Sequence, residues 1–226
     1  MRRRPVVFPL DAGSGCAIQS YQLVGMPTNT AKETPATKAR LLDAAERLMV
    51  AKGFAATTVD EICEAAKLTK GGFFHYFQSK DQLGQELLKR FCANGERLHR
   101  GFCGKERDPL KRVYAYVEGA SKLLQDPSTQ GCLLGTFAQE LCDTNPQIRQ
   151  ACAEGFEGWA KQFGEELVRA KARYAPRASF NPAELAHHFI AILEGSLILG
   201  KATKDMRVGT TNLRHFKAYL KTLFGR

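Results

Sequence analysis

Residues 57–83, TTVDEICEAAKLTKGGFFHYFQSKDQL, decide the fold of this chain. Thr58 is followed three residues later by Glu61, which is the pattern of a capping box at a helix start. The apolar residues after this box recur at helical spacing, so the stretch predicts an amphipathic helix of about two turns. Lys67, Leu68 and Thr69 are too few for anything but a turn, and Thr69 can cap a following helix.

A second short helix is expected over about 70–77. It opens with Gly71 and Gly72, and each glycine costs about 1 kcal/mol relative to alanine in a helix interior. A sequence tolerates that cost where the backbone must approach a bulky group, such as a phosphate or another helix. Ser79 and Gln82 then form a second capping-box pattern, which starts a further helix. This order of elements is typical of a helix-turn-helix DNA-binding protein.

The helix after Ser79 carries a lysine in its first turn. The positive end of this helix and the Lys80 ammonium together predict an anchor for a DNA phosphate. We expect phosphate contacts to supply affinity and a few side chains in the major groove to select the sequence. The residues predicted to contact DNA are Thr58, Thr69, Lys70, Gly71, Gly72, Phe73, His75, Tyr76 and Lys80.

The segment from about Thr37 to Phe91 resembles the N-terminal domain of the tetracycline-repressor (TetR) family of bacterial transcription factors. The matching motifs are a Gly-Phe pair, Thr-Thr-Val, Ile-x-x-x-Ala, Lys-Gly-x-x-aromatic and Phe-x-Ser-Lys. They contain Gly53, Phe54, Thr57, Thr58, Val59, Ile62, Ala66, Lys70, Gly71, Phe74, Phe77, Ser79 and Lys80. The resemblance implies a dimeric regulator with a helical C-terminal domain that binds an effector.

Two positions depart from the family pattern. Phe74 stands where the family often has tyrosine, and phenylalanine cannot donate the hydrogen bond that a tyrosine hydroxyl would give to a phosphate. His75 and Tyr76 can restore polar contacts from neighbouring positions. Gly72 stands where threonine is common, which removes one side chain that could contact DNA.

The composition is that of a soluble globular protein with a basic surface. The chain has 226 residues, 44% hydrophobic and 25% charged, with a formal net charge of +10. A positive net charge favours an anionic partner. However, residues 35–90 contain nine Lys/Arg and seven Asp/Glu, so the charge is not concentrated in the proposed DNA-binding part and is also compatible with a solvated surface.

The chain is expected to be cytoplasmic. No apolar run reaches the ~18–20 residues that a membrane span needs; residues 189–199 come nearest, and Glu194 interrupts them. The basic start Met1–Arg4 is followed by a short apolar run that Asp11 ends, so a signal peptide is not predicted. Seven cysteines without C-x-x-C pairs indicate a reducing compartment and no zinc site. No metal and no cofactor are predicted.

Three parts of the chain are predicted. Residues 1–34 show no periodicity and are expected to be a disordered tail, within which Met26 is a candidate for the natural start. Residues 35–82 are predicted to be the helix-turn-helix domain. Residues 83–226 are predicted to be a helical domain for effector binding and dimerisation, joined to the first by a continuous helix without a linker.

The C-terminal part is predicted to be all-α, because no segment shows sustained alternation of apolar and polar residues. Asp108-Pro109, Asn145-Pro146 and Asn181-Pro182 each combine a capping side chain with proline at the first helical position. About nine helices are expected in the whole chain. Their predicted ranges are 35–52, 59–66, 70–77, 80–92 or further, 109–125, 131–142, 146–174, 182–204, and a last helix from Thr210 or Thr211 to about 224.

The helix predicted over 182–204 is apolar nearly all round and contains small residues that let another helix approach closely. It is either buried within one subunit or, with the last helix, forms a four-helix bundle with a second copy. The second alternative would place two recognition helices about 34–36 Å apart, on successive major grooves. The predicted interface residues are His188, Ala191, Ile192, Gly195 and Leu199.

Aromatic residues in the C-terminal part either line a cavity for a small apolar or aromatic effector, as the resemblance implies, or form an ordinary core. Cys132 lies at a predicted helix N-terminus, where the macrodipole can lower a thiol pKa; it is either a reactive thiol or a small buried apolar residue. The candidate effector residues are Tyr116, Cys132, Phe137, Phe156 and Trp159.

The predicted function is a sequence-specific, DNA-binding transcriptional regulator, a repressor released from its operator by a small-molecule effector. The alternative is a cysteine-based redox or electrophile sensor, or a small-molecule carrier, with little DNA binding. No enzyme is predicted, because no sequence signature supports a catalytic pair with Cys132. His187 and His188 are adjacent and point about 100° apart on a helix, so they cannot chelate one metal together.

Overall fold

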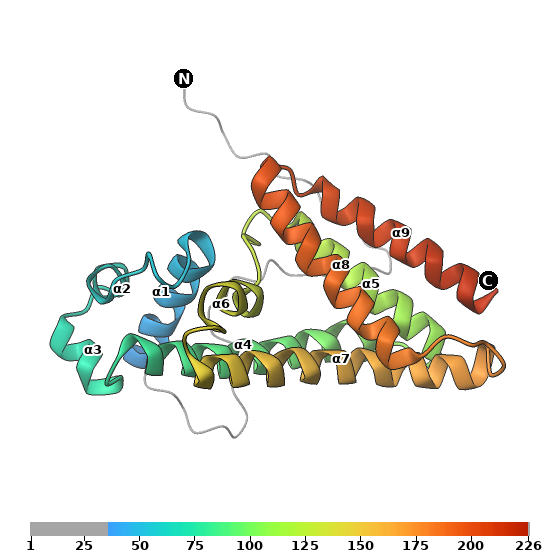
Figure 1. Cartoon of the computed structure of the whole chain (residues 1–226), viewed down its shortest axis with the longest axis horizontal. Coiled ribbons are helices and arrows are strands. Elements are labelled where there is room, and N and C mark those ends of the chain that lie inside the picture. Colours follow the sequence, from blue (N-terminus) through green and yellow to red (C-terminus); the bar gives the residue numbers. More distant parts are fainter. Residues whose placement is uncertain (1–35, 226) are drawn as a thin grey trace. The chain divides into compact units, whose positions relative to one another are not determined.

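The computed structural model describes residues 36–225 of the chain, and Figure 1 shows the helices of that part. The prediction of an all-α fold is confirmed. The predicted tail, residues 1–34, and the candidate start Met26 lie outside the described residues. The helices are α1 (Ala36–Lys52), α2 (Val59–Ala66), α3 (Lys70–Tyr76), α4 (Lys80–Cys103), α5 (Pro109–Gln125), α6 (Leu133–Leu141), α7 (Pro146–Tyr174), α8 (Pro182–Thr203) and α9 (Arg207–Phe224).

Helix α2 and the turn after it follow the sequence prediction. The Thr58 hydroxyl accepts a hydrogen bond from the Glu61 amide (3.2 Å), and the Glu61 carboxylate accepts one from the Thr58 amide (2.8 Å), so the capping box is confirmed. Lys67 ends the helix in the left-handed conformation, with φ of 53°. Thr69 then accepts a hydrogen bond from the Gly72 amide (3.2 Å) and starts α3, which fixes the turn between the two helices.

The second predicted capping box forms only in part. Ser79 caps α4 by accepting a hydrogen bond from the Gln82 amide (3.1 Å). The Gln82 side chain, however, accepts from the amide of Gln78 (2.6 Å) and not from that of Ser79. The helix start was therefore predicted correctly, and the reciprocal bond falls one residue earlier in the chain.

Helices α5, α7 and α8 begin at the predicted prolines, each capped by the side chain before it. Asp108, Asn145 and Asn181 accept hydrogen bonds from backbone amides in the first turns. The predicted start of α9 at Thr210 or Thr211 is wrong, since the helix begins at Arg207. Thr210 lies within the first turn and donates its hydroxyl hydrogen to the Arg207 carbonyl (3.0 Å), a bond that threonine makes inside helices as well as at their starts.

Helix α4 is continuous from Lys80 to Cys103 and packs along α7 (Figure 1). Its first turns bury Leu83 and Leu87, whereas its last residue, Cys103, is buried near α5. The predicted domain boundary at residues 82 and 83 lies inside the first turn of this helix. The part that resembles a DNA-binding domain and the C-terminal helices therefore share one rigid element.

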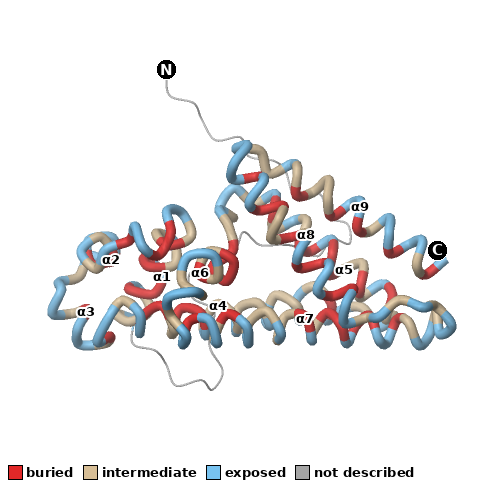
Figure 2. Tube along the Cα trace, viewed as in Figure 1, coloured by how far each residue is buried: buried red, intermediate tan, exposed pale blue. Residues whose placement is uncertain are grey.

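Helices α5, α7, α8 and α9 pack against one another, and Figure 2 shows their buried residues on the facing sides. Helix α6 contacts α7 and also α1 and α4. Helix α8 is long and apolar enough to cross a membrane by length and composition. Phe189 on α8 is fully buried and its ring packs against Phe163 of α7 and Phe216 of α9, as expected for a core helix.

Candidate DNA-binding surface and effector region

Helix α3 has one buried face and one exposed face. Phe73 and Phe77, four residues apart, are buried with ring centroids 5.6 Å apart. The prediction that Phe73 contacts DNA is therefore wrong, because the i, i+4 pair of phenylalanines anchors the helix to the core. Lys70, Phe74 and His75 are exposed on the other face. Of the adjacent Phe73 and Phe74, Phe73 is buried and Phe74 is 55% exposed.

His75 and Tyr76 differ in exposure. His75 is exposed, whereas Tyr76 is partly buried against the core, and their rings meet edge to face at 4.8 Å. His75 is therefore open to a large partner, and Tyr76 can present only part of its side chain.

Lys70 lies at the first position of α3 and forms an ion pair with Asp60 of α2 (2.8 Å). A hydrogen bond to Asp60 raises the pKa of Lys70, so its ammonium stays charged. Both side chains are more than 60% exposed, and exposed pairs of this kind are weak because water screens them. The Lys70 ammonium can therefore exchange Asp60 for a phosphate.

Lys80 has a different role from the predicted one. Its ammonium donates hydrogen bonds to the carbonyls of Phe54 and Thr57, both at 2.9 Å. It also lies over the Phe54 ring, 4.3 Å from the centroid. These contacts bind the loop after α1 to the start of α4. The positive charge near a helix start, which suggested a phosphate anchor, is directed towards the protein interior.

The glycines of α3 are not required by contacts inside the protein. A Cβ atom at Gly71 would meet only the Thr69 hydroxyl oxygen, at 3.8 Å, and one at Gly72 would meet atoms of Thr69 and Leu68 at 3.6–3.9 Å. These are ordinary van der Waals distances. At these two positions no side chain covers the backbone of α3, which lets a large partner approach it there.

Helix α6 connects the loop after α1 to the C-terminal helices. Its Glu140 carboxylate accepts hydrogen bonds from the amides of Phe54 (3.2 Å) and Ala55 (2.9 Å), in the loop after α1. The Phe137 ring meets the Phe54 ring edge to face at 5.2 Å. Gly53 has φ of +93°, and a Cβ there would lie 2.2 Å from the Glu140 carboxylate, so only glycine permits this contact.

Ion pairs hold α1 against α4. Arg90 of α4 donates to Asp43 (2.6 Å) and to Glu46 of α1, and Lys38 pairs with Glu86 (3.3 Å). The Arg90 side chain is 77% buried, and its partners Asp43 and Glu46 are three residues apart, about one turn of α1. These ion pairs link α1 to α4.

Two family models match this chain. Residues 41–87 match the model of bacterial regulatory proteins of the tetR family, and residues 109–216 match the tetracyclin repressor-like C-terminal domain. The chain belongs to the TetR family. It is a DNA-binding transcriptional regulator, as the helix-turn-helix surface predicted.

Individual relatives agree with this assignment. The chain is 26% identical over 188 residues to the HTH-type transcriptional repressor NemR of Escherichia coli K12, covering 82% of this chain and 94% of NemR. The crystal structure of reduced E. coli NemR superimposes with a TM-score of 0.69, over 80% of this chain and 96% of that one. The crystal structure of the regulatory protein TetR from Rhodobacter sphaeroides is 26% identical, with a TM-score of 0.71 and coverage of 80% and 96%.

In the C-terminal domain of this TetR-family chain, Tyr116 lies at the centre of an aromatic cluster. Its ring stacks on Phe163 at 4.9 Å and meets His99 edge to face at 5.1 Å, and its hydroxyl accepts a hydrogen bond from the Trp159 indole. Burial raises the pKa of Tyr116, so the hydroxyl stays neutral. The cluster was found only in part from the sequence: Tyr116 and Trp159 were predicted, whereas the residues missed are His99, Phe102, Phe189 and Phe216.

Two other predicted effector residues, Phe137 and Cys132, have neighbours outside this cluster. Phe137 packs against Phe54, as described above, and Cys132 lies beside Glu194 of α8. Phe156 is partly buried against the core. Helical spacing could not show this, because it gives the face of a helix but not which helix that face meets.

Cys132 is buried at the start of α6, with 8% exposure. Burial and the neighbouring Glu194 raise the pKa of the Cys132 thiol well above its ordinary value, and burial likewise raises the pKa of Glu194. The expected lowering by the helix macrodipole is outweighed. Burial also raises the pKa of Cys103 to about 11 and that of Cys152 to about 12, so these thiols stay protonated at neutral pH.

In the described part of the chain, three residues of types that can bind a metal ion lie together. They are His99, Cys103 and Glu166, whose possible ligand atoms are within 4.8 Å of one another. The Glu166 carboxylate, however, is held by Arg112 (2.6 and 2.7 Å) and Arg169 (2.8 Å). Two guanidinium groups beside the same carboxylate oppose a further cation. The group is best described as a buried ion-pair network that binds α5 to α7.

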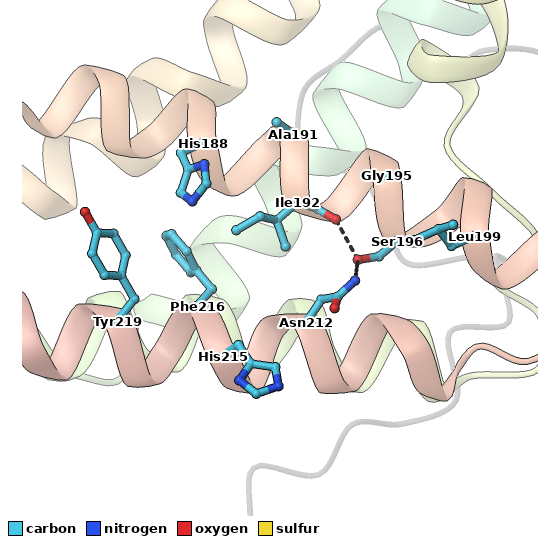
Figure 3. Close-up of a pocket in the computed structure, with 10 residues that line it drawn as sticks. All are labelled: His188, Ala191, Ile192, Gly195, Ser196, Leu199, Asn212, His215, Phe216 and Tyr219. Carbon is cyan, nitrogen blue, oxygen red and sulfur yellow. Dashed lines mark hydrogen bonds between the residues drawn. The ribbon is translucent and has the colours of Figure 1, made fainter.

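The outer face of α8 and α9 forms a pocket of about 400 Å³ (Figure 3). Ser196 donates to the Ile192 carbonyl (2.6 Å) and accepts from Asn212 of α9 (3.0 Å), which holds the two helices together at one end. Leu199 and Tyr219 on this face are 49% and 46% exposed. All five residues predicted for the dimer interface line this pocket: His188, Ala191, Ile192, Gly195 and Leu199.

Proposed function

We propose that this chain represses transcription as a homodimer whose two α3 helices enter successive major grooves of an operator, and that a small apolar or aromatic effector releases it. The exposed face of α3 is the observation that carries the proposal. It combines the backbone at Gly71 and Gly72 with the exposed side chains of Lys70, Phe74 and His75, while Phe73 anchors the helix. A helix anchored on one face and open on the other fits a major groove.

Lys70 and Thr69 support DNA binding from the start of α3. Both are exposed, and the Lys70 ammonium is held only by a solvent-exposed carboxylate. Thr58 is also exposed, at the start of α2. We assign phosphate contacts to these residues and base contacts to His75, with Tyr76 contributing its accessible edge. Lys80 is withdrawn from the set because its ammonium binds protein carbonyls.

A gel-shift titration against the DNA upstream of the protein's own gene tests the proposal. The wild-type protein should give a specific complex that weakens steeply as salt rises, because bound phosphates release counterions. His75→Ala should lose specific binding, whereas His187→Ala, on the exposed surface of α8, should bind as the wild type does. Absence of a salt-sensitive specific complex would refute the assignment.

The face of α8 and α9 supports a homodimer. Exposed apolar side chains, small residues and a pocket lie together there, as an interface between two helices from each subunit would require (Figure 3). A Cβ atom at Gly195 would meet no atom within 4 Å, so a larger side chain fits the subunit itself. In the proposed dimer, a larger side chain in place of Gly195 would lie between the two subunits.

Gly195→Leu should therefore convert the protein to a monomer without unfolding it, as measured by analytical ultracentrifugation and circular dichroism. Gly101→Leu is the matched control, because a Cβ at Gly101 also meets nothing within 4 Å and lies on the exposed surface of α4. A Gly195→Leu protein that stays dimeric would place the interface elsewhere.

We assign effector binding to the surroundings of Tyr116 and Trp159, where aromatic rings from α4, α5, α7 and α8 meet. An effector that separated these rings would displace α4, and α4 carries α1 through Arg90. Helix α6 offers a second connection through Glu140 and the loop after α1. Either displacement would change the spacing of the two α3 helices, which lowers operator affinity.

Trp159 is the single tryptophan of the chain, so its fluorescence reports on this region. A panel of small aromatic compounds should contain members that quench Trp159 and release the operator at the same concentrations. By thermodynamic reciprocity, operator DNA should weaken the binding of such a compound by the same factor. Compounds that release DNA without affecting Trp159 would place the effector site elsewhere.

The alternative, a cysteine-based sensor or carrier, is less well supported. The raised pKa of Cys132 keeps the thiol protonated, and only the thiolate reacts rapidly. We therefore expect the wild type and Cys132→Ser to respond to oxidants in the same way when operator binding is measured by gel shift. Because the proposed partner is bacterial DNA, we infer a cytoplasmic location and a role as a binding protein, not an enzyme.

A further inference from the structure

We propose that Phe74 selects thymine in the operator, by packing its ring against the 5-methyl group of that base in the major groove. The inference deepens the proposed function and rests on it, because it requires that α3 enter the groove. The sequence prediction did not include Phe74 among the DNA-contacting residues. Phe74 therefore adds a specificity contact that neither the motifs nor the family match assigned.

The exposure of Phe74 is the first observation. Its side chain is 55% exposed, although neighbouring Phe73 and nearby Phe77 are buried. The other large apolar side chains exposed in the described part of the chain are Val168, Ile198, Leu199 and Tyr219, all in the C-terminal helices. Phe74 is thus the large exposed apolar group of the DNA-binding region, and it lies on the helix that faces the groove.

The orientation of the ring is the second observation. The Phe74 ring meets the buried Phe73 ring edge to face, with centroids 5.3 Å apart. Phe73 is fixed because it has no exposed surface. An aromatic ring held in this way loses little rotational freedom when it binds, so more of the burial free energy remains for the contact.

The space beside the ring is the third observation. A helical side chain lies over the turn that precedes its own Cα atom, which for Phe74 contains Lys70 and Gly71. Gly71 has no side chain, and a Cβ there would meet only the Thr69 hydroxyl oxygen at 3.8 Å. A small apolar group on the partner can therefore enter next to the Phe74 ring.

The chemistry of the ring selects the base. Phenylalanine offers no hydrogen-bond donor or acceptor, so it cannot recognise a phosphate oxygen or a polar base edge as tyrosine can. In the major groove, thymine alone presents a methyl group, and apolar side chains contact it. An exposed phenylalanine at this place in α3 fits thymine better than any other base.

The experiment replaces thymine by 2′-deoxyuridine in the operator, after footprinting has located it upstream of the protein's own gene. The replacement removes the methyl group and leaves hydrogen bonds, phosphates and backbone unchanged. Thymines are replaced one symmetric pair at a time, and affinity is measured by fluorescence anisotropy. At one pair, wild-type affinity should fall by about fifteenfold, since one buried methyl corresponds to about fourfold in each half-site.

Phe74→Ala should bind the thymine operator more weakly and should show no further loss with deoxyuridine at that pair. Because Phe74 is exposed, this variant should unfold at the same temperature as the wild type. Val168→Ala, which truncates an equally exposed side chain on α7, should keep the full sensitivity to deoxyuridine.

Two results overturn the inference: specific binding by the wild type that no deoxyuridine pair affects, or equal sensitivity in the wild type and Phe74→Ala. A wild-type protein without any specific operator complex is a distinct result. It refutes the proposed function and, with it, this contact.

Discussion

The helix starts of the DNA-binding region and the aromatic region around Tyr116 are defined by contacts of very different range. The bonds that define α2 and α3 join residues three apart, Thr58 with Glu61 and Thr69 with Gly72. In the aromatic region, the Tyr116–Trp159 bond joins residues 43 apart, and Arg112 meets Glu166 across 54 residues. The helix starts of the first region can therefore be predicted from local sequence, and the second region depends on how distant helices pack.

The two regions also use their residues in opposite ways. The DNA-binding region exposes the side chains that we propose contact DNA, on a helix anchored by the buried Phe73 and Phe77. The aromatic region buries side chains that we propose surround an effector, and burial keeps the Tyr116 hydroxyl neutral by raising its pKa. Substitutions can test this contrast between the two regions, because some should affect stability alone and others DNA binding alone.

The largest effect is expected for Phe73→Ala. It removes a fully buried ring from the anchor of α3 and should lower the free energy of unfolding by about 3–5 kcal/mol, measured by urea denaturation. Phe74→Ala, one residue away, should change it by less than about 0.5 kcal/mol because the ring is exposed. Similar losses for the two variants would show that the faces of α3 are assigned wrongly.

The next largest effect is expected for Glu166→Gln. This substitution should lower the free energy of unfolding by about 3 kcal/mol, because it leaves the guanidinium groups of Arg112 and Arg169 without their buried counter-charge. Glu165→Gln is the matched control; its carboxylate is exposed and 3.9 Å from Arg169, so little stability should change. Operator affinity per folded molecule should be unaffected by either substitution. A stable Glu166→Gln protein would show that the network is not a major source of stability.

The same carboxylate predicts a pH dependence. Burial alone would raise the pKa of Glu166, but Arg112 and Arg169 outweigh it and hold the pKa below its ordinary value of 4.5. The stability contributed by this lowered pKa is therefore fully present above pH 4.5 and is lost as the pH falls through the folded-state value. Urea titrations at a series of pH values should show this loss in the wild type and a smaller one in Glu166→Gln.

A smaller effect, about 1–2 kcal/mol, is expected for Glu140→Gln, which weakens two hydrogen bonds to a charged acceptor. The amides of Phe54 and Ala55 should then exchange hydrogen faster, which mass spectrometry can measure. Glu154→Gln, on the exposed surface of α7, should leave both amides protected. Unchanged exchange in Glu140→Gln would remove α6 as a link to the DNA-binding region.

The smallest effect on stability, and one of opposite sign, is expected for Gly71→Ala. Alanine fits at this position and is the better helix former, so stability should rise by up to about 1 kcal/mol. Operator affinity should nevertheless fall, because the added methyl group separates the helix backbone from DNA. Gly101→Ala should also stabilise but should keep full affinity. An affinity unchanged in Gly71→Ala would show that DNA does not approach this part of α3 closely.

Most of the helix boundaries could be predicted, because caps, prolines and turns act within four residues. The Asp108-Pro109 and Asn145-Pro146 pairs started α5 and α7 where the sequence indicated. The start of α9 could not be found in the same way. Asp205 accepts the Arg207 amide there (3.0 Å), but the sequence offered Thr210 and Thr211 as equally good caps.

The sequence alone determined that this chain is helical, that it contains a helix-turn-helix and that its α8 has a face suited to another helix. The tertiary structure decided that Phe73 lies inside and Phe74 outside, that Lys80 binds carbonyls of the loop after α1, and that Phe137 and Tyr116 belong to different clusters. The physical reason is one of range. A cap or turn is satisfied by neighbours in the chain, whereas the environment of a side chain depends on which distant helix covers it.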